Sequence, residues 1–133
     1  MKLLSTKVNT GMVHFSLLLL RVGLGLMMMV HGWQKLQRFS EMAAQFADPL
    51  HVGTRGSLVL VLFSELGCAF LVMLGLLTRF AALVLLIQLC IVVLIIHRGD
   101  FGHQELGLHF LLGYLVILLC GPGRISVDRL IAR

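Results

Sequence analysis

The sequence predicts an all-α integral membrane protein, a four-helix bundle with a short interfacial helix between its first and second spans. Hydrophobic residues make up 59% of the 133 residues and charged residues only 13%, which lies outside the range of soluble domains. The apolar residues form four runs, each close to the length that crosses a hydrocarbon core of about 30 Å. We expect residues 1–133 to form a single transmembrane domain.

The first span is expected over residues 12–33. Lys2 and Lys7 precede it, as in a secretory signal, but no small-residue cleavage site follows Val30. We therefore expect an uncleaved helix that stays in the mature protein.

Arg21 interrupts this apolar helix. A charged side chain at the centre of a membrane helix costs roughly 2.5 to 3.5 kcal/mol on insertion scales, so Arg21 requires a partner. The same helical face continues through Gly25, Met28 and Gly32 to Lys35. Because glycines let helices approach closely, this face is predicted to turn inward.

Residues 37–55 are more polar, yet they contain a helical pattern that begins at Ser40, a candidate N-cap. The apolar residues Phe39, Met42 and Phe46 recur at helical spacing, which predicts a short amphipathic helix on the membrane surface. This segment is either a connector or a lid over the outer mouth of the bundle.

The second span is expected over residues 57–77, with Glu65 as its one ionisable residue. Glu65 follows the start of the span by eight residues, about 12 Å of helix, and Arg21 follows the start of its own span by nine. Since consecutive spans run antiparallel, both side chains are expected near the midplane. We therefore predict a buried polar pair between Arg21 and Glu65.

The third and fourth spans are expected over residues 80–96 and 104–119. Gln88 is the strongly polar residue of the third span. Glu105 and His109 lie four residues apart in the first turns of the fourth span, on one helical face. The tail begins with a turn at 121–123, and its apolar residues suggest a segment lying against the bilayer surface.

The positions of the basic residues predict that both termini are cytoplasmic. An even number of spans places the termini on one side, which carries six lysines and arginines against four on the other. The net charge of +5 is scattered over short loops, a pattern that does not indicate a nucleic-acid partner. Five histidines then fall near the outer face: His31, His51, His97, His103 and His109.

The three cysteines form no C-x-x-C pair and lie in or beside apolar segments, as small buried hydrophobes do. A redox pair of Cys68 with Cys90 stays open as an alternative. No metal ligands are assigned, because the histidines form no H-x-x-x-H pair within one helix. A haem would require His31 and His109 to face each other, and we do not favour it.

The inward-facing polar residues allow two interpretations. In the first they are structural ion pairs, Arg21 with Glu65 and Lys35 with Glu105, that fix the register of the bundle. In the second they form a site, since a quinone ring needs an apolar slot and hydrogen-bond donors for its carbonyl groups. The candidates for ligand binding or proton exchange are His31, Lys35, Gln88, Glu105 and His109.

Several of these residues lie in motifs that together resemble the DoxX family of small bacterial four-helix membrane proteins. The motifs are LRVGLGLMMMVHGWQKL in the first span, Glu65 followed by LGLLTR, Glu105, and the tail GPGRISVD. Within them, the HG-x-x-K element at His31, Gly32 and Lys35 and the GPGR-x-S-x-D element from Gly121 to Asp128 are the most specific in combination.

The resemblance implies a bacterial inner (plasma) membrane location and, in some relatives, quinone-coupled oxidation of reduced sulfur, redox-stress complexes or assembly of partner proteins. We expect a membrane subunit of a redox system, either non-catalytic or quinone-linked, with the quinone near the outer ends of the first and fourth spans. Expected partners are the lipid bilayer, membrane or peripheral oxidoreductase subunits, and a second copy of the chain. The alternatives are an assembly or chaperone membrane protein without catalysis and a small proton-coupled transporter.

Overall fold

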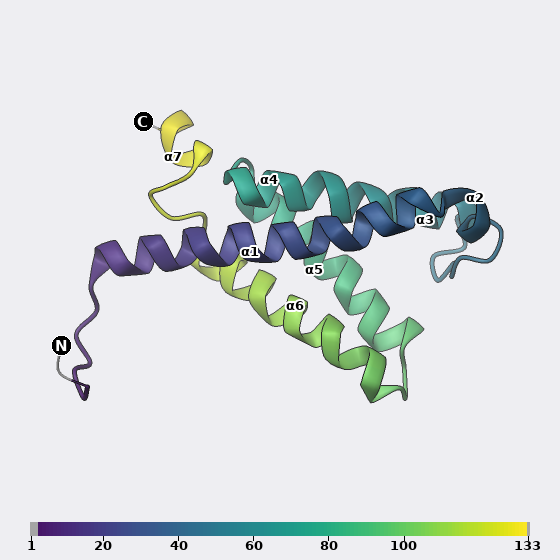
Figure 1. Cartoon of the computed structure of the whole chain (residues 1–133), viewed down its shortest axis with the longest axis horizontal. Coiled ribbons are helices and arrows are strands. Elements are labelled where there is room, and N and C mark those ends of the chain that lie inside the picture. The colour runs from purple at the N-terminus through teal and green to yellow at the C-terminus, as the bar shows by residue number, and fades with distance from the viewer. Residues whose placement is uncertain (1–2, 133) are drawn as a thin grey trace.

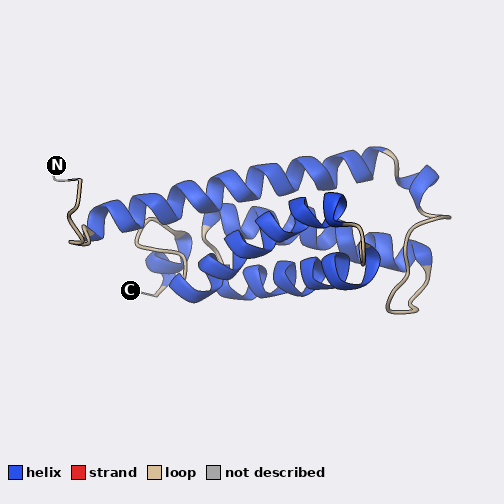
Figure 2. Cartoon of the chain, turned by 90° about the horizontal axis from the view of Figure 1, so that it is seen from below, coloured by secondary structure: helices blue, strands red, loops and turns tan. Residues whose placement is uncertain are grey.

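The computed structural model describes residues 3–132, and this part of the chain is helical throughout apart from loops and turns (Figures 1 and 2). Four helices are long and apolar enough to cross a membrane, which confirms the predicted fold class. The helical elements, in order, are α1 (Thr10–Gln37), α2 (Phe39–Met42), α3 (Thr54–Leu62), η1 (Phe63–Cys68), α4 (Ala69–Leu74), α5 (Thr78–Ile91), η2 (Val92–Ile96), α6 (Phe101–Cys120) and α7 (Val127–Ile131).

The second and third spans each contain a π-helical segment, η1 in the second and η2 in the third. The second span is therefore α3, η1 and α4 in series, and the third is α5 followed by η2. α1 packs along α4 and η1, and α5 packs along α6 (Figure 1). These contacts, with those of α5 against η1 and α4 and of α6 against α1, join all four spans into one bundle.

The two ends of the bundle differ in what covers them. The start of α1, the turn between α4 and α5, and α7 lie at one end, here named the terminal end (Figures 1 and 2). The connection 38–53 and the turn between η2 and α6 lie at the other, here named the loop end. The start of α1 and α7 thus lie at the same end of the bundle (Figures 1 and 2), as an even number of spans requires.

Two glycines of α1 set its register against the second span. A Cβ atom added at Gly32 would lie 3.0 Å from Cβ of Glu65, and one added at Gly25 would lie 3.0 Å from the carbonyl oxygen of Ala69. Contacts this short are tighter than nearly all real Cβ contacts, so a side chain at either position would force its neighbours to shift, and glycine favours the close approach. The register places the last third of α1, and not its middle, beside Glu65.

The buried face of α1 is the predicted one, since Arg21, Gly25, Met28 and Gly32 are all buried. The core between the spans is filled by apolar side chains and by Tyr114, whose hydroxyl group donates a hydrogen bond to the carbonyl oxygen of Leu24 over 3.2 Å. The outer faces carry large exposed apolar side chains, including Leu19, Met27, Phe63, Leu83 and Leu112. Such a surface suits a lipid bilayer, so the chain is a multi-pass membrane protein.

The connection between the first and second spans is less helical than its spacing predicts, because α2 ends at Met42. Asp48 organises the rest: its carboxylate accepts hydrogen bonds from the backbone N–H groups of Val52 and Gly53 at 3.0 and 2.9 Å, and from the Ser57 hydroxyl group at 2.8 Å. These bonds, that from Ser57 first, hold the pKa of Asp48 below its usual range. They fix the connection to the start of α3.

Candidate functional site

Glu65 lies at the centre of a buried polar cluster. It sits in η1 with 4% of its surface exposed. One carboxylate oxygen, Oε1, is 2.5 Å from Nζ of Lys35 on α1 and accepts a hydrogen bond from Nε2 of Gln88 on α5 over 3.1 Å. π-helical turns are frequent at functional sites, and here one presents the carboxylate to two other spans.

The salt bridge joins a buried group to a partly exposed one, because 29% of the Lys35 side-chain surface is exposed and only 5% of that of Glu65. A carboxylate this deep is costly unless it is paired, and Lys35 supplies the charge from the last turn of α1. The second oxygen of Glu65, Oε2, is buried and has no hydrogen-bond partner among residues 3–132. The site therefore has hydrogen-bonding capacity to spare.

A cavity of about 190 Å³ lies beside this cluster, between α1, α5 and α6 at the loop end. We name it the polar cavity. Its wall also contains Met28, Leu89 and Phe110, which give it an apolar side, and the imidazole of His31 meets the Phe110 ring edge-on at 5.7 Å between centroids. Its polar lining consists of His31, Lys35, Glu65, Gln88, His97 and His103.

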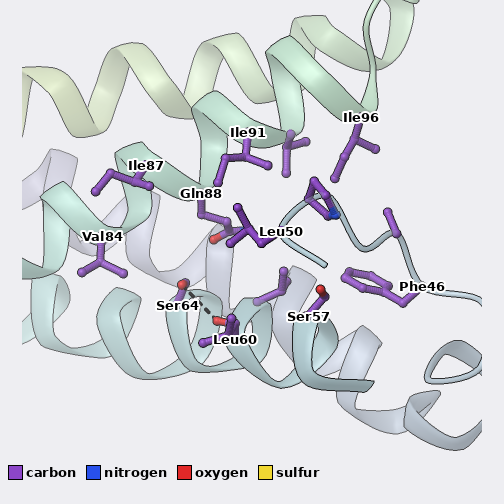
Figure 3. Close-up of a pocket in the computed structure, with 14 residues that line it drawn as sticks. Phe46, Leu50, Ser57, Leu60, Ser64, Val84, Ile87, Gln88, Ile91 and Ile96 are labelled. Atoms are coloured by element: carbon purple, nitrogen blue, oxygen red, sulfur yellow. Dashed lines mark hydrogen bonds between the residues drawn. The ribbon is translucent and has the colours of Figure 1, made fainter. Parts of the chain in front are cut away.

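A second cavity of about 170 Å³ lies between the second and third spans (Figure 3). We name it the apolar pocket. Phe46, Pro49 and Leu50 of the connection 38–53 line it at the loop end. Gln88 and Val92 line both the apolar pocket and the polar cavity, so a wall only about one side chain thick separates them.

The structure brings four of the predicted site residues together at the polar cavity, namely His31, Lys35, Glu65 and Gln88. Glu105 and His109 lie elsewhere. Both are exposed on α6, and their one mutual contact is a hydrogen bond within the helix, from Nδ1 of His109 to the carbonyl oxygen of Glu105 at 2.8 Å. Phe110, and not His109, is the residue of this turn that faces inward.

The predicted pair of Arg21 with Glu65 does not form, and neither does the alternative pair of Lys35 with Glu105. Glu65 is bonded to Lys35, and the fully buried Arg21 donates to the backbone carbonyl oxygens of Val72, at 3.4 Å, and Ile125. The prediction assumed that both helices begin at equal depth. α1 is instead shifted along the second span, so that Gly32 meets Glu65 and Arg21 lies beside the end of α4, toward the terminal end.

Arg21 belongs to a second polar cluster, formed with the tail. Asp128 accepts hydrogen bonds from the backbone N–H groups of Leu77 and Thr78, at 2.7 and 2.9 Å, and from the Thr78 hydroxyl group at 2.7 Å. Partial burial raises the pKa of Asp128, but these bonds and the nearby Arg21 charge outweigh it and hold that pKa below its usual range. The tail thus caps α5 through Asp128, while its apolar residues Ile125, Leu130 and Ile131 stay exposed.

Two histidines at the polar cavity, His97 and His103, were expected near the outer face but not among the candidate site residues. The rings of His97 and His103 stack with centroids 5.4 Å apart, and Nδ1 of His103 lies 2.5 Å from a carboxylate oxygen of Asp100. Asp100 is the N-cap of α6, and its bond to His103 lowers the pKa of its carboxyl group. The available signal was an Asp three residues before a His at the start of a helix.

The cysteines and histidines show no further cluster in the described residues. Cys68, Cys90 and Cys120 are free thiols, and Cys68 is buried. Within residues 3–132, no group of three or more His, Cys, Asp or Glu side chains is placed to hold a metal ion. The polar cavity is therefore the place where the chemistry-bearing side chains meet.

A family model matches the part of the chain that contains most of these residues. The family model described as DoxX matches residues 16–98, which is more than half of the chain and includes Arg21, Lys35, Glu65 and Gln88. Neither among curated proteins nor among solved structures does any protein match the chain. The four membrane-spanning helices and the matched segment lead to one conclusion: this chain belongs to the DoxX family.

Proposed function

We propose that this protein is a membrane subunit of a redox system and that its polar cavity binds the head group of a lipid-soluble quinone carrier. The observation that carries the proposal is the Lys35–Glu65 salt bridge beside a cavity of about 190 Å³. Ionisable residues within membrane spans usually mark a functional site. Three of the residues expected to serve such a ligand, His31, Lys35 and Gln88, line this one cavity.

The residues at the cavity match the needs of a quinone head group. The ammonium group of Lys35 has three N–H donors, and Glu65 engages one of them, so others are free to donate to a carbonyl oxygen. His31 offers a second donor, while Met28, Leu89 and Phe110 supply apolar contact for a ring. A bound quinone carrier supplies coupled electron and proton transfer, and Glu65 and Lys35 are the groups that would hold or move a proton there.

The orientation and the partners are part of the proposal. In the sequence, the two termini and the turn between the second and third spans carry more lysines and arginines than the other two connections, which favours a cytoplasmic position for both termini, in a bacterial inner membrane. The loop end and the polar cavity then face the outer side. Membrane or peripheral oxidoreductase subunits, or a second copy of the chain, would supply what a single small bundle lacks.

The direct test is binding of duroquinone, a quinone without a long chain, to the protein in lipid nanodiscs. Lys35→Met removes the charged donor, and we expect it to weaken binding about tenfold or more, since hydrogen bonds to charged groups contribute that much. Glu105→Gln alters an exposed acidic residue of α6 and serves as the control, with unchanged binding expected. Equal affinities for the wild type and Lys35→Met would refute the proposed head-group site.

An assembly role without a ligand is the second candidate, and the same salt bridge favours it. Lys35 neutralises Glu65 across a glycine-mediated helix contact, as a purely structural pair would. This alternative predicts that Glu65→Gln lowers the amount of folded protein or of a partner, with no small molecule retained by the wild type. Mass spectrometry of gently purified protein, searching for a bound quinone, distinguishes the two.

A further inference from the structure

In the described part of the chain, the apolar pocket has a neutral lining, and three of its lining side chains are polar. Among residues 3–132, no charged side chain lines it, and the polar lining consists of Ser57, Ser64 and Gln88. The rest is aliphatic or aromatic and comes from α3, α5, η2 and the connection 38–53 (Figure 3). An occupant of this pocket must therefore be uncharged and mostly hydrocarbon.

The polar side chains already donate hydrogen bonds to the protein itself. The Ser64 hydroxyl group donates to the carbonyl oxygen of Leu60 over 3.1 Å, and the Ser57 hydroxyl group donates to Asp48 over 2.8 Å. The amide nitrogen of Gln88 uses one of its two hydrogens on Glu65, over 3.1 Å. The two serines therefore offer an occupant only lone pairs, and acceptor atoms predominate among the polar atoms of the pocket.

Gln88 provides the strongest of these acceptors. Its Oε1 atom is buried and has no hydrogen-bond partner among the described residues. Figure 3 shows the Gln88 side chain reaching into the pocket from α5. The orientation of the amide is set by chemistry, because an ionised carboxylate accepts and cannot donate, so the NH₂ group must face Glu65. A buried acceptor left unpaired is destabilising, and an occupant that donates a hydrogen bond to it would relieve that cost.

We propose that the apolar pocket is a second ligand site and that it selects the reduced, hydroxyl-bearing form of the carrier, the quinol. The ring lies among the apolar side chains of the second and third spans, and a hydroxyl group donates to Oε1 of Gln88. A quinone would instead set its carbonyl oxygens against acceptor atoms. That the ligand is a neutral hydrogen-bond donor follows from the pocket itself, whereas its identity as a quinol rests on the proposed function.

The test compares two ligands with the same ring, one with hydroxyl donors and one in which methyl groups replace the donated hydrogens. Durohydroquinone carries two hydroxyl groups, and its dimethyl ether has the same ring and methyl groups but no donor. Binding is measured by anaerobic equilibrium dialysis against protein in nanodiscs, with empty nanodiscs correcting for partition into lipid. We expect the hydroquinone to bind about fivefold more tightly, the contribution of one hydrogen bond.

Three variants locate the binding. Val84→Phe fills the pocket and should abolish the hydroquinone preference, whereas Leu83→Phe adds the same ring to an exposed position outside it and should not. Gln88→Leu removes the acceptor and should bring the ratio of the two affinities close to one. Circular dichroism and gel filtration of each variant confirm that the fold is retained.

The outcomes separate this inference from the proposed function. Equal affinities of the hydroquinone and its ether for the wild type, a preference that persists in Val84→Phe, or no binding of either ligand would each overturn the inference. Duroquinone binding that depends on Lys35 supports the polar cavity whatever happens at Val84. Conversely, a hydroquinone preference that depends on Val84, without any duroquinone binding, would retain the second site and reject the quinone site.

Discussion

Nζ of Lys35, in the last turn of α1, lies 2.5 Å from a carboxylate oxygen of Glu65 in the middle of the second span. This contact ties the end of one span to the centre of the next and places a charge pair at the wall of the polar cavity. Removing one partner leaves the other charge without compensation in a low-dielectric environment, which is more costly than removing both.

The first prediction concerns this coupling. Lys35→Met should lower the free energy of unfolding, by about 3 kcal/mol as an upper value for a buried pair and less here because Lys35 is partly exposed. The double variant Lys35→Met with Glu65→Gln should recover part of that loss. Unfolding in detergent, followed by circular dichroism for both single variants and the double variant, measures the coupling. Strictly additive effects would show that the two residues do not interact.

The second prediction concerns the tail. Asp128→Ala removes the acceptor for the N–H groups at the start of α5, and loss of a helix cap costs about 1 kcal/mol. It also removes the charge nearest to Arg21 in the terminal-end cluster. Arg129→Ala changes the exposed neighbouring residue and should leave stability as it is. The midpoints of thermal unfolding of the two variants measure this difference in stability. Equal midpoints would argue against the capping role of Asp128.

The third prediction concerns pH and the connection 38–53. The Ser57 hydroxyl group, followed by the N–H groups of Gly53 and Val52, lowers the pKa of Asp48. Because the pKa is lower in the folded state, this carboxylate supports the connection above the pKa of the unfolded chain and ceases to do so as the pH falls through the folded value. Ser57→Ala should therefore move the acid loosening of the connection to higher pH.

Limited proteolysis at acid pH, with an acid-active protease, measures this loosening. Ser40→Ala, in α2 and outside the Asp48 network, is the matched control and should follow the wild type. Coincident profiles for Ser57→Ala and the wild type would mean that the Ser57 bond does not set the pKa of Asp48.

The fourth prediction concerns the close approach of α1 and η1. A methyl group at Gly32 would lie 2.9 Å from Cγ of Leu66 and 3.0 Å from Cβ of Glu65, so Gly32→Ala should force the helices apart and cost about 1–3 kcal/mol. Gly23 lies in the same helix, and a methyl group there would meet nothing within 4 Å. Gly23→Ala should be neutral or slightly stabilising. Unfolding and duroquinone binding are measured for both, and equal behaviour would mean that the contact is not tight.

The sequence predicted the number of spans and the buried face of α1, because both follow from local composition and helical period. It misplaced Arg21 relative to Glu65, since counting depth from the expected ends of the spans assumes that the two helices lie level, whereas α1 is shifted along the second span. The register is instead set by where Gly25 and Gly32 meet the second span, a relationship between two helices that no single-helix pattern contains.

Two other differences between prediction and structure also arise from contacts between helices that a single-helix pattern does not contain. α6 is apolar on nearly every side, so its period identifies no inward face, and Glu105 and His109 turned out to lie on the exposed one. Asp128 meets Thr78 fifty residues earlier in the chain, and the tail pattern alone did not reveal which helix it caps. Whether His31, Lys35, Gln88 and Glu65 bind a ligand stays a prediction for the experiments above.

Gln88 lines both the polar cavity and the apolar pocket. Its amide nitrogen donates to Glu65, and its amide oxygen has no hydrogen-bond partner among the described residues. The same amide therefore contributes to both sites: its nitrogen helps to satisfy Glu65 in the polar cavity, and its oxygen is the acceptor of the apolar pocket. A substitution at position 88 alters both sites together, so neither can be changed independently through this residue.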